Sequence, residues 1–281
     1  MQRMLIVGLL LTVPVVAWQV RTPVEQAGPA PQVQNGRVLV RTGGDIAREI
    51  AGASAPGSVE PVWLAWRVPL IDGDRDLCGW YSDRLGTVRA LFVDDTVVAA
   101  PEAGTERARP RIAPQTGPIP LEAGTGLVVL VRVVGGQVER LRTAGDDCPM
   151  DAGGRTVHWL STVAADESLR FLVRLVDARA DGTASDIERR AADTALRAIA
   201  LHGGTGADAL LERIAADAID AAGRRQAAAA LGAYRGSAGI DALIRLARTS
   251  QESAVRTEAV RALSQSADPR AAGLLEEIIK R

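Results

Sequence analysis

Two interleaved apolar stripes run through the last third of the chain. Within each stripe the apolar positions follow i, i+3, i+4 and i+7, the spacing of one helix face. The first stripe occupies residues 192–199, 227–234 and 259–263, and the second occupies 207–214, 240–247 and 271–278. Their period of about 33 residues predicts three copies of a helix–turn–helix unit in residues 181–281. One unit cannot bury its own stripe, so the three are expected to stack around one core.

Local signals agree with these helix boundaries. Ser185 and Glu188 have the spacing of a capping box, and Asp268 followed by Pro269 suits an N-cap with proline at the first helical position. The glycine-rich stretch at 203–206 imitates a phosphate-binding loop. It has no lysine and no preceding strand, so we interpret it as a turn between two helices.

Residues 37–180 show a different pattern, which is mostly that of strands. Short runs rich in Val, Leu and Trp predict strands at 37–41, 61–69, 127–134, 137–143 and 157–160. Gly135-Gly136 between the third and fourth runs suits a two-residue hairpin turn. The nearly continuous apolar character of 127–134 indicates a strand that is covered on both faces.

Helical spacing also predicts two helices in this part, near 45–53 and 166–176, while the five prolines of 101–120 predict a loop. The fold class expected is α+β in two domains: a mainly β domain at 37–180, then an all-α solenoid of three helix pairs at 181–281. A chain of 281 residues is long enough for two separate cores.

The N-terminus has the pattern of an export signal. Arg3 precedes an apolar run at residues 4–17, which is too short to span a bilayer and suits the hydrophobic region of a signal peptide. Val15 and Ala17 suit cleavage after Ala17, and residues 18–36 then form a spacer. The alternative is an uncleaved N-terminal membrane anchor. Both place the protein outside the cytoplasm, as a periplasmic or secreted protein.

Export decides how the two cysteines are interpreted. Cys78 and Cys148 are the only cysteines in the chain. In an oxidising compartment they are expected to form a disulfide. A zinc site and a redox pair are the alternatives, but two thiols supply only half of a tetrahedral zinc site and no Cys-x-x-Cys is present.

The charge is balanced, and this disfavours one class of partner. The whole chain has a formal net charge of −1. Nucleic-acid binding depends largely on neutralising phosphates, so no nucleic-acid partner is expected.

One acidic stretch resembles a metal-binding loop. Asp72, Asp74 and Asp76 alternate like calcium ligands, and Asp83 lies at the twelfth position of such a loop. However, Leu77 stands where the loop needs glycine. A solvated polar loop is the better interpretation, and no metal or cofactor is expected.

No catalytic constellation is apparent. His158 and His202 are the only histidines, and the chain has no nucleophile-elbow pattern. Trp63, Trp66 and Trp80 are candidates for an exposed aromatic platform, but Trp63 and Trp66 point to opposite faces of one strand. At least one of them is therefore expected in the core.

Three arginines recur in register near the start of the first helix of each unit: Arg189, Arg224 and Arg256. Together with the motif VRTEAVRALSQSADPRAAGLLEEI, they resemble the short bacterial HEAT-like repeats. The resemblance implies that each arginine pairs with a turn carboxylate of an adjoining repeat. Asp220 and Glu252 are the acids in position, whereas Ser185 replaces the acid in the first repeat.

The segments VWLAWRVP, VHWLSTV, IALHGG and ALSQS, with the Cys78 region, further resemble a group of exported bacterial HEAT-repeat proteins that carries no assigned reaction. The resemblance implies a non-enzymatic scaffold of the cell envelope that binds a protein partner through its repeats. The alternative is an envelope hydrolase or a carbohydrate-binding accessory with its site in the β domain.

Overall fold

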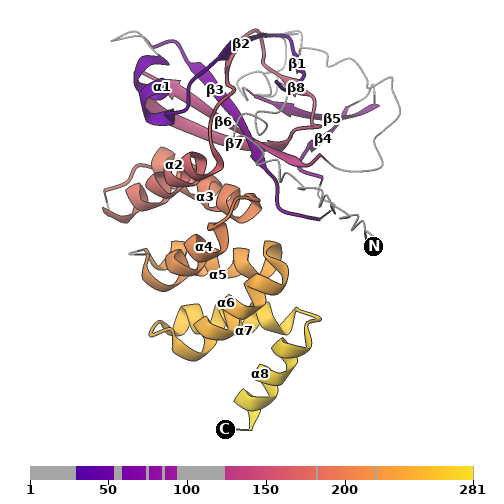
Figure 1. Ribbon diagram of the computed structural model, residues 1–281, viewed down its shortest axis with the longest axis vertical. Coiled ribbons are helices and arrows are strands. Elements are labelled where there is room, and N and C mark those ends of the chain that lie inside the picture. Colours follow the sequence, from indigo (N-terminus) through magenta and orange to yellow (C-terminus); the bar gives the residue numbers. More distant parts are fainter. Residues whose placement is uncertain are drawn as a thin grey trace, which may run out of the picture.

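A strand-rich region precedes a run of helices in the computed structural model (Figure 1). The structure describes residues 30–53, 59–73, 76–83, 86–93, 124–181, 183–218 and 220–280. The predicted signal peptide, much of the spacer and the predicted loop at 101–120 lie outside these residues. Within them, no helix is both long enough and apolar enough to cross a membrane.

The larger sheet has five strands in the order β2-β9-β3-β6-β7. Each was expected from an apolar run. β9 runs parallel to its two neighbours, while β6 runs antiparallel to both β3 and β7. The strands are β2 (Arg37–Arg41), β3 (Val62–Pro69), β6 (Gly126–Val134), β7 (Gln137–Gly145) and β9 (Thr156–Leu160).

The β6–β7 hairpin forms where the glycine pair predicted it. Gly135 and Gly136 have φ values of 55° and 77°, in the left-handed region that a primed two-residue turn requires. Most of β6 is fully buried, so the expectation of cover on both faces is confirmed.

A smaller sheet, which the sequence pattern did not predict, has the strand order β1-β8-β5-β4. Its members are β1 (Val33–Gln34), β4 (Gly79–Asp83), β5 (Gly86–Phe92) and β8 (Met150–Asp151). Two of these strands are only two residues long, and such short segments show no recognisable alternation.

The larger sheet separates two hydrophobic clusters. Trp66 lies on the face covered by helices, whereas Trp63 and Trp159 lie on the opposite face with Met150 of the smaller sheet. Trp63 and Trp66 are both completely buried. They therefore belong to the core and form no exposed platform.

Cys78 and Cys148 form the predicted disulfide, with their Cα atoms 5.4 Å apart. Cys78 directly precedes β4, and Cys148 lies between β7 and β8. The bond thus ties the smaller sheet to the edge of the larger one.

The helices continue from the sheets in a single stack (Figure 1). α1 (Ile46–Ala53) and α2 (Ala165–Asp177) correspond to the two helices expected in the first part. The three predicted pairs follow: α3 (Asp186–Leu201) with α4 (Ala207–Asp217), α5 (Ala221–Tyr234) with α6 (Gly236–Thr249), and α7 (Ser253–Ser264) with α8 (Pro269–Ile279).

Both predicted caps are present. Ser185 and Glu188 form the reciprocal capping box of α3. The Asp268 carboxylate accepts a hydrogen bond from the backbone N–H of Arg270 at the start of α8, with Pro269 at the first helical position. Residues 203–206 form the turn between α3 and α4, as the sequence predicted.

The structure differs from the expectation of two separate cores. One buried cluster runs from the helix-covered face of the larger sheet through α2 and α3 to α8. The end of β3 also meets the α3–α4 turn, where the Ile71 N–H donates to the Leu201 carbonyl at 2.8 Å and the Gly203 N–H donates to the Pro69 carbonyl at 2.7 Å. The larger sheet and the repeat helices therefore share one core, and α2 packs on α3 as a member of the stack.

Candidate functional site

The recurring arginines lie near the starts of α3, α5 and α7, as the pattern indicated, but only one of them reaches the acid of the next unit. Arg224 of α5 forms an ion pair with Glu252 at 3.2 Å, across one helix pair. Arg256 donates to the carbonyls of Ser250 and Gln251, at 2.8 and 2.9 Å. Arg189 pairs with Asp186 on its own helix.

Asp220 takes a partner that the sequence pattern did not suggest. Its carboxylate pairs at 2.7 Å with Arg179, which also pairs with Asp193. Arg179 lies in the short 3₁₀ helix after α2 (Ala178–Asp181) and is mostly buried. Arg179 therefore forms the ion pair with Asp220 that Arg189 was expected to form.

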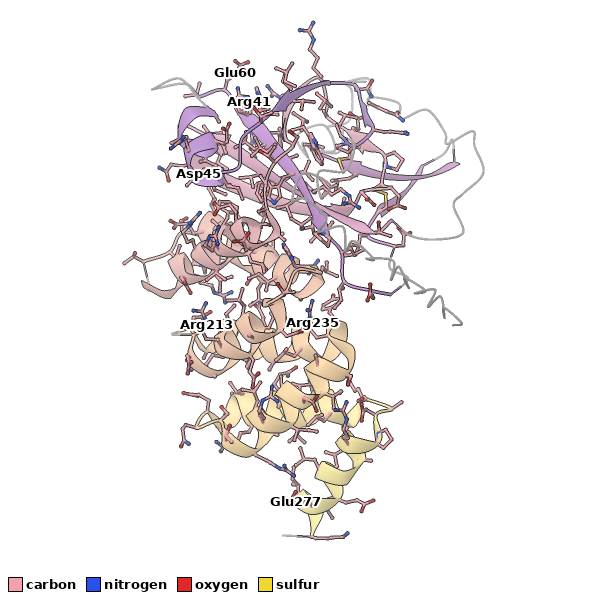
Figure 2. All side chains as sticks on the ribbon, viewed as in Figure 1. Arg41, Asp45, Glu60, Arg213, Arg235 and Glu277 are labelled. Atoms are coloured by element: carbon pink, nitrogen blue, oxygen red, sulfur yellow. A yellow bond between two sulfur atoms is a disulfide. The ribbon has the colours of Figure 1, made fainter. Side chains whose placement is uncertain are left out.

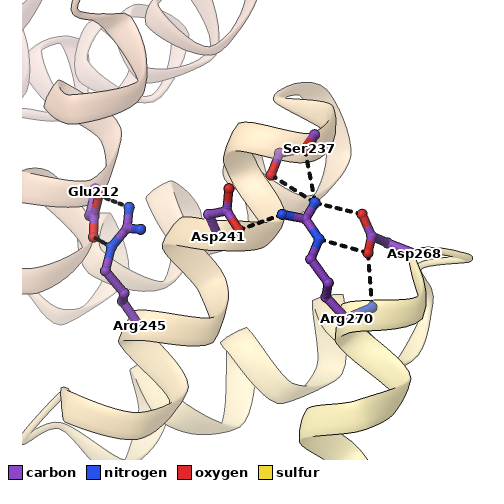
Figure 3. A network of polar contacts seen from close by, with 6 residues as sticks. All are labelled: Glu212, Ser237, Asp241, Arg245, Asp268 and Arg270. Carbon is purple, nitrogen blue, oxygen red and sulfur yellow. Dashed lines mark hydrogen bonds and ion pairs between the residues drawn. The ribbon is translucent and has the colours of Figure 1, made fainter.

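A second set of ion pairs connects the other row of helices, α4, α6 and α8 (Figure 3). Arg245 of α6 binds Glu212 of α4 through two hydrogen bonds of 2.6 and 2.7 Å. The two residues are 33 positions apart, one repeat length. The hydrogen bonds from Arg245 lower the pKa of Glu212.

The junction between α6 and α8 is bridged twice. Arg270 of α8 pairs with Asp241 and also donates to the Ser237 hydroxyl at 2.8 Å (Figure 3). Arg248 of α6 pairs with Glu277 at 2.8 Å. Charged side chains therefore span both junctions in this part of the row.

The first junction of the same row, between α2 and α4, is arranged differently. A groove of about 650 Å³ lies there. Leu169 and Val173 of α2 and Ala209 and Leu210 of α4 supply its apolar lining. Gly206, the N-cap of α4, also lines the groove. No ion pair joins α2 to α4 within the described residues.

The charges at this groove are mainly basic. Arg170 and Arg174 of α2 are held by acids of their own helix, with Asp166 and Glu167 as the partners. The side chain of Arg213 of α4 is exposed and has no hydrogen-bond or ion-pair partner among the residues that the structure describes. The groove thus combines an apolar lining with one arginine side chain, Arg213, that is free to pair with a ligand.

Comparison with protein families agrees with this architecture, because residues 207–281 match the HEAT repeats. This part of the chain is a HEAT-like repeat domain. No curated protein and no solved structure was found to match the chain. HEAT repeats commonly serve as scaffolds for protein–protein interaction.

A buried arginine holds the HEAT-like repeats to the preceding turn, and sequence reasoning missed it. Arg235, between α5 and α6, is 8% exposed and pairs with Asp208 of α4. It also donates to the carbonyls of Ala200 and His202, at 3.2 and 2.9 Å. Arg213 and Arg235 lie on opposite sides of the stack in the view of Figure 2. A single arginine before a glycine gives no periodic signal that predicts this contact.

The two histidines lie apart and occupy different environments. His202 is completely buried at the α3–α4 turn, and its Nδ1 accepts a hydrogen bond from the Gly204 N–H at 2.9 Å. Burial, assisted by the nearby Arg235 charge, lowers the pKa of His202 to about 4. His158 lies on β9, where burial is the main cause of its lowered pKa and the Arg41 charge adds to it.

The candidate calcium loop is only partly within the described residues. Asp83 belongs to β4, and the Asp76 carboxylate accepts a hydrogen bond from the Cys78 N–H at 3.1 Å. Asp72 is also described, while Asp74 is not. No group of three or more His, Cys, Asp or Glu side chains that could hold a metal occurs in the described part of the chain.

Proposed function

We propose that this protein is a non-enzymatic scaffold of the cell envelope, which binds a protein partner in the groove between α2 and α4. The observation that carries the proposal is the contrast along one row of helices. Ion pairs span the α4–α6 and α6–α8 junctions, whereas the α2–α4 junction leaves an apolar groove of about 650 Å³.

The chemistry of the groove specifies the kind of partner. The aliphatic side chains of Leu169, Val173 and Leu210 suit the apolar face of a helix or extended segment. Arg213 at the same groove favours a segment that carries a carboxylate beside its apolar residues. We therefore expect an amphipathic, acidic segment of another protein.

The envelope location rests on two supports. The apolar run at residues 4–17 suits a signal peptide, and a disulfide such as Cys78–Cys148 persists in oxidising compartments. If the signal is cleaved as proposed, N-terminal sequencing of the protein from an envelope fraction will begin at Trp18. Recovery from the cytoplasm with Met1 in place would contradict the location.

Binding is tested by affinity capture from envelope extracts with two matched variants. Ala209 lines the groove and is exposed on α4, while Ala272 is exposed on α8, in the same row of helices. Ala209→Arg should fill the groove and abolish capture of the partner, and Ala272→Arg should leave capture unchanged. Equal capture by the wild type and both variants would show that the groove is not the binding site.

A further inference from the structure

A second pocket lies at the seam between the β6–β7 hairpin and α3, away from the groove. Its volume is about 460 Å³. Figure 1 shows α3 next to the β7 edge of the larger sheet, and the two elements are in contact. The lining consists of Arg132, Glu139, Arg140, Leu141, Arg142, Ile187, Arg190, Ala191 and Thr194.

Positive charge dominates this lining, with four arginines and one glutamate. Glu139 is committed to Arg132, with which it forms an ion pair at 2.9 Å. Arg140 and Arg142 have contacts of their own. The side chain of Arg190 is exposed and has no hydrogen-bond or ion-pair partner in the described part of the chain, so its guanidinium is available to a ligand.

Arg132 offers a second, independent sign of a missing partner. Its Nε atom is buried and donates no hydrogen bond. Most buried polar atoms in folded proteins are hydrogen-bonded, because an unmade bond leaves the desolvation cost of the group uncompensated. Arg132, which lines the pocket, therefore has one donor without a partner.

Apart from Thr194, the remaining lining is apolar. Leu141 and Ala191 are buried beneath the pocket, and Ile187 is 41% exposed at its side. An exposed isoleucine beside several arginines suits a molecule that has an anionic group and an apolar body. A bare inorganic anion would leave this surface uncovered.

We propose that this pocket binds a small organic anion whose carboxylate or phosphate group faces Arg190 and Arg132, and whose apolar body packs on Ile187. Guanidinium groups bind both kinds of oxyanion through strong, charge-assisted hydrogen bonds. The site goes beyond the scaffold function and does not depend on it, because the groove between α2 and α4 shares no lining residue with the pocket.

The test is isothermal titration of the full chain with two probes, phenyl phosphate and benzoate, at constant ionic strength. At least one probe should bind saturably with a stoichiometry of one, and the tighter of the two identifies the preferred anion. Arg190→Gln should weaken that binding by about tenfold or more, since it removes a charge-assisted hydrogen bond. Arg190 is exposed, so the variant is expected to fold.

The matched control is Arg197→Gln, because Arg197 is exposed on the same helix but does not line the pocket. This variant should bind the probe like the wild type. The proposal is overturned if neither probe binds saturably, if Arg190→Gln binds as tightly as the wild type, or if both variants lose affinity equally. The last result would indicate attraction to the general surface charge.

Discussion

The first junction of the α2–α4–α6–α8 row differs from the two that follow it. At the later junctions Arg245, Arg248 and Arg270 each reach a carboxylate of the neighbouring helix. At the first junction, Arg170 and Arg174 pair within α2, and Arg213 of α4 has no partner among the described residues. One row of similar helices therefore has two closed junctions and one open groove.

The comparison shows that the ion pairs between helices are surface features and that another interaction must hold the stack together. The bridging side chains are substantially exposed, for example 56% for Arg245 and 30% for Glu212. Exposed ion pairs contribute at most about 1 kcal/mol each. The stack must therefore depend on its continuous apolar core, and the first junction can lack ion pairs with little loss of stability.

The largest effect is expected from the core that all the junctions share. Leu243 is fully buried in the middle of α6. Leu243→Ala should lower the free energy of unfolding by about 2–5 kcal/mol, because it leaves a cavity between repeats. Denaturant melts that follow the helical signal would measure this loss. A loss as small as that of a surface variant would contradict the stacking.

A comparable loss of stability is expected in the strand-rich region, which is stabilised by a disulfide. Cys78→Ala removes the disulfide to Cys148 and should cost about 2–5 kcal/mol, as the loss of native bridges commonly does. The wild-type protein, alkylated without reductant, should show the two cysteines linked by mass analysis. Two alkylated thiols in the exported protein would contradict the bond.

A pH-dependent effect is expected at the seam between sheet and repeats. The pKa of His202 is about 4 in the folded protein and 6.5 ordinarily, so the unfolded chain binds a proton more readily between these values. The stability linked to neutral His202 is therefore present above pH 6.5 and is lost as the pH falls to 4. The free energy of unfolding should decrease by roughly 3 kcal/mol over this range. Urea melts across this range should show a steeper loss for the wild type than for His202→Gln. Equal slopes would mean that His202 titrates normally.

The smallest effect is expected from the exposed bridge between α4 and α6. Arg245→Ala should cost about 0.5 kcal/mol or less. A double-mutant cycle with Glu212→Ala measures the coupling directly, and the coupling should shrink at high salt. A coupling well above 1 kcal/mol would show that these ion pairs hold the junctions together.

The sequence predicted the elements that have a period or a local signal. The repeat helices followed from their apolar spacing, and the β6–β7 turn followed from Gly135-Gly136. The two-residue strands β1 and β8 carry no such pattern. The contacts of Arg179 and Arg235 join residues far apart in the chain, so neither was predictable from spacing. The groove was not predictable either, because it depends on α2 joining the stack.

Site-specific photo-crosslinking tests the central claim, that the first junction is open to a partner while the later ones are closed. A photoreactive amino acid would replace Ala209 at the groove or, in a second variant, the exposed Ala272 on α8. Irradiation in envelope extracts should attach one protein of defined mass at position 209, with none at 272. No adduct at position 209, or the same adducts at both positions, would contradict the account.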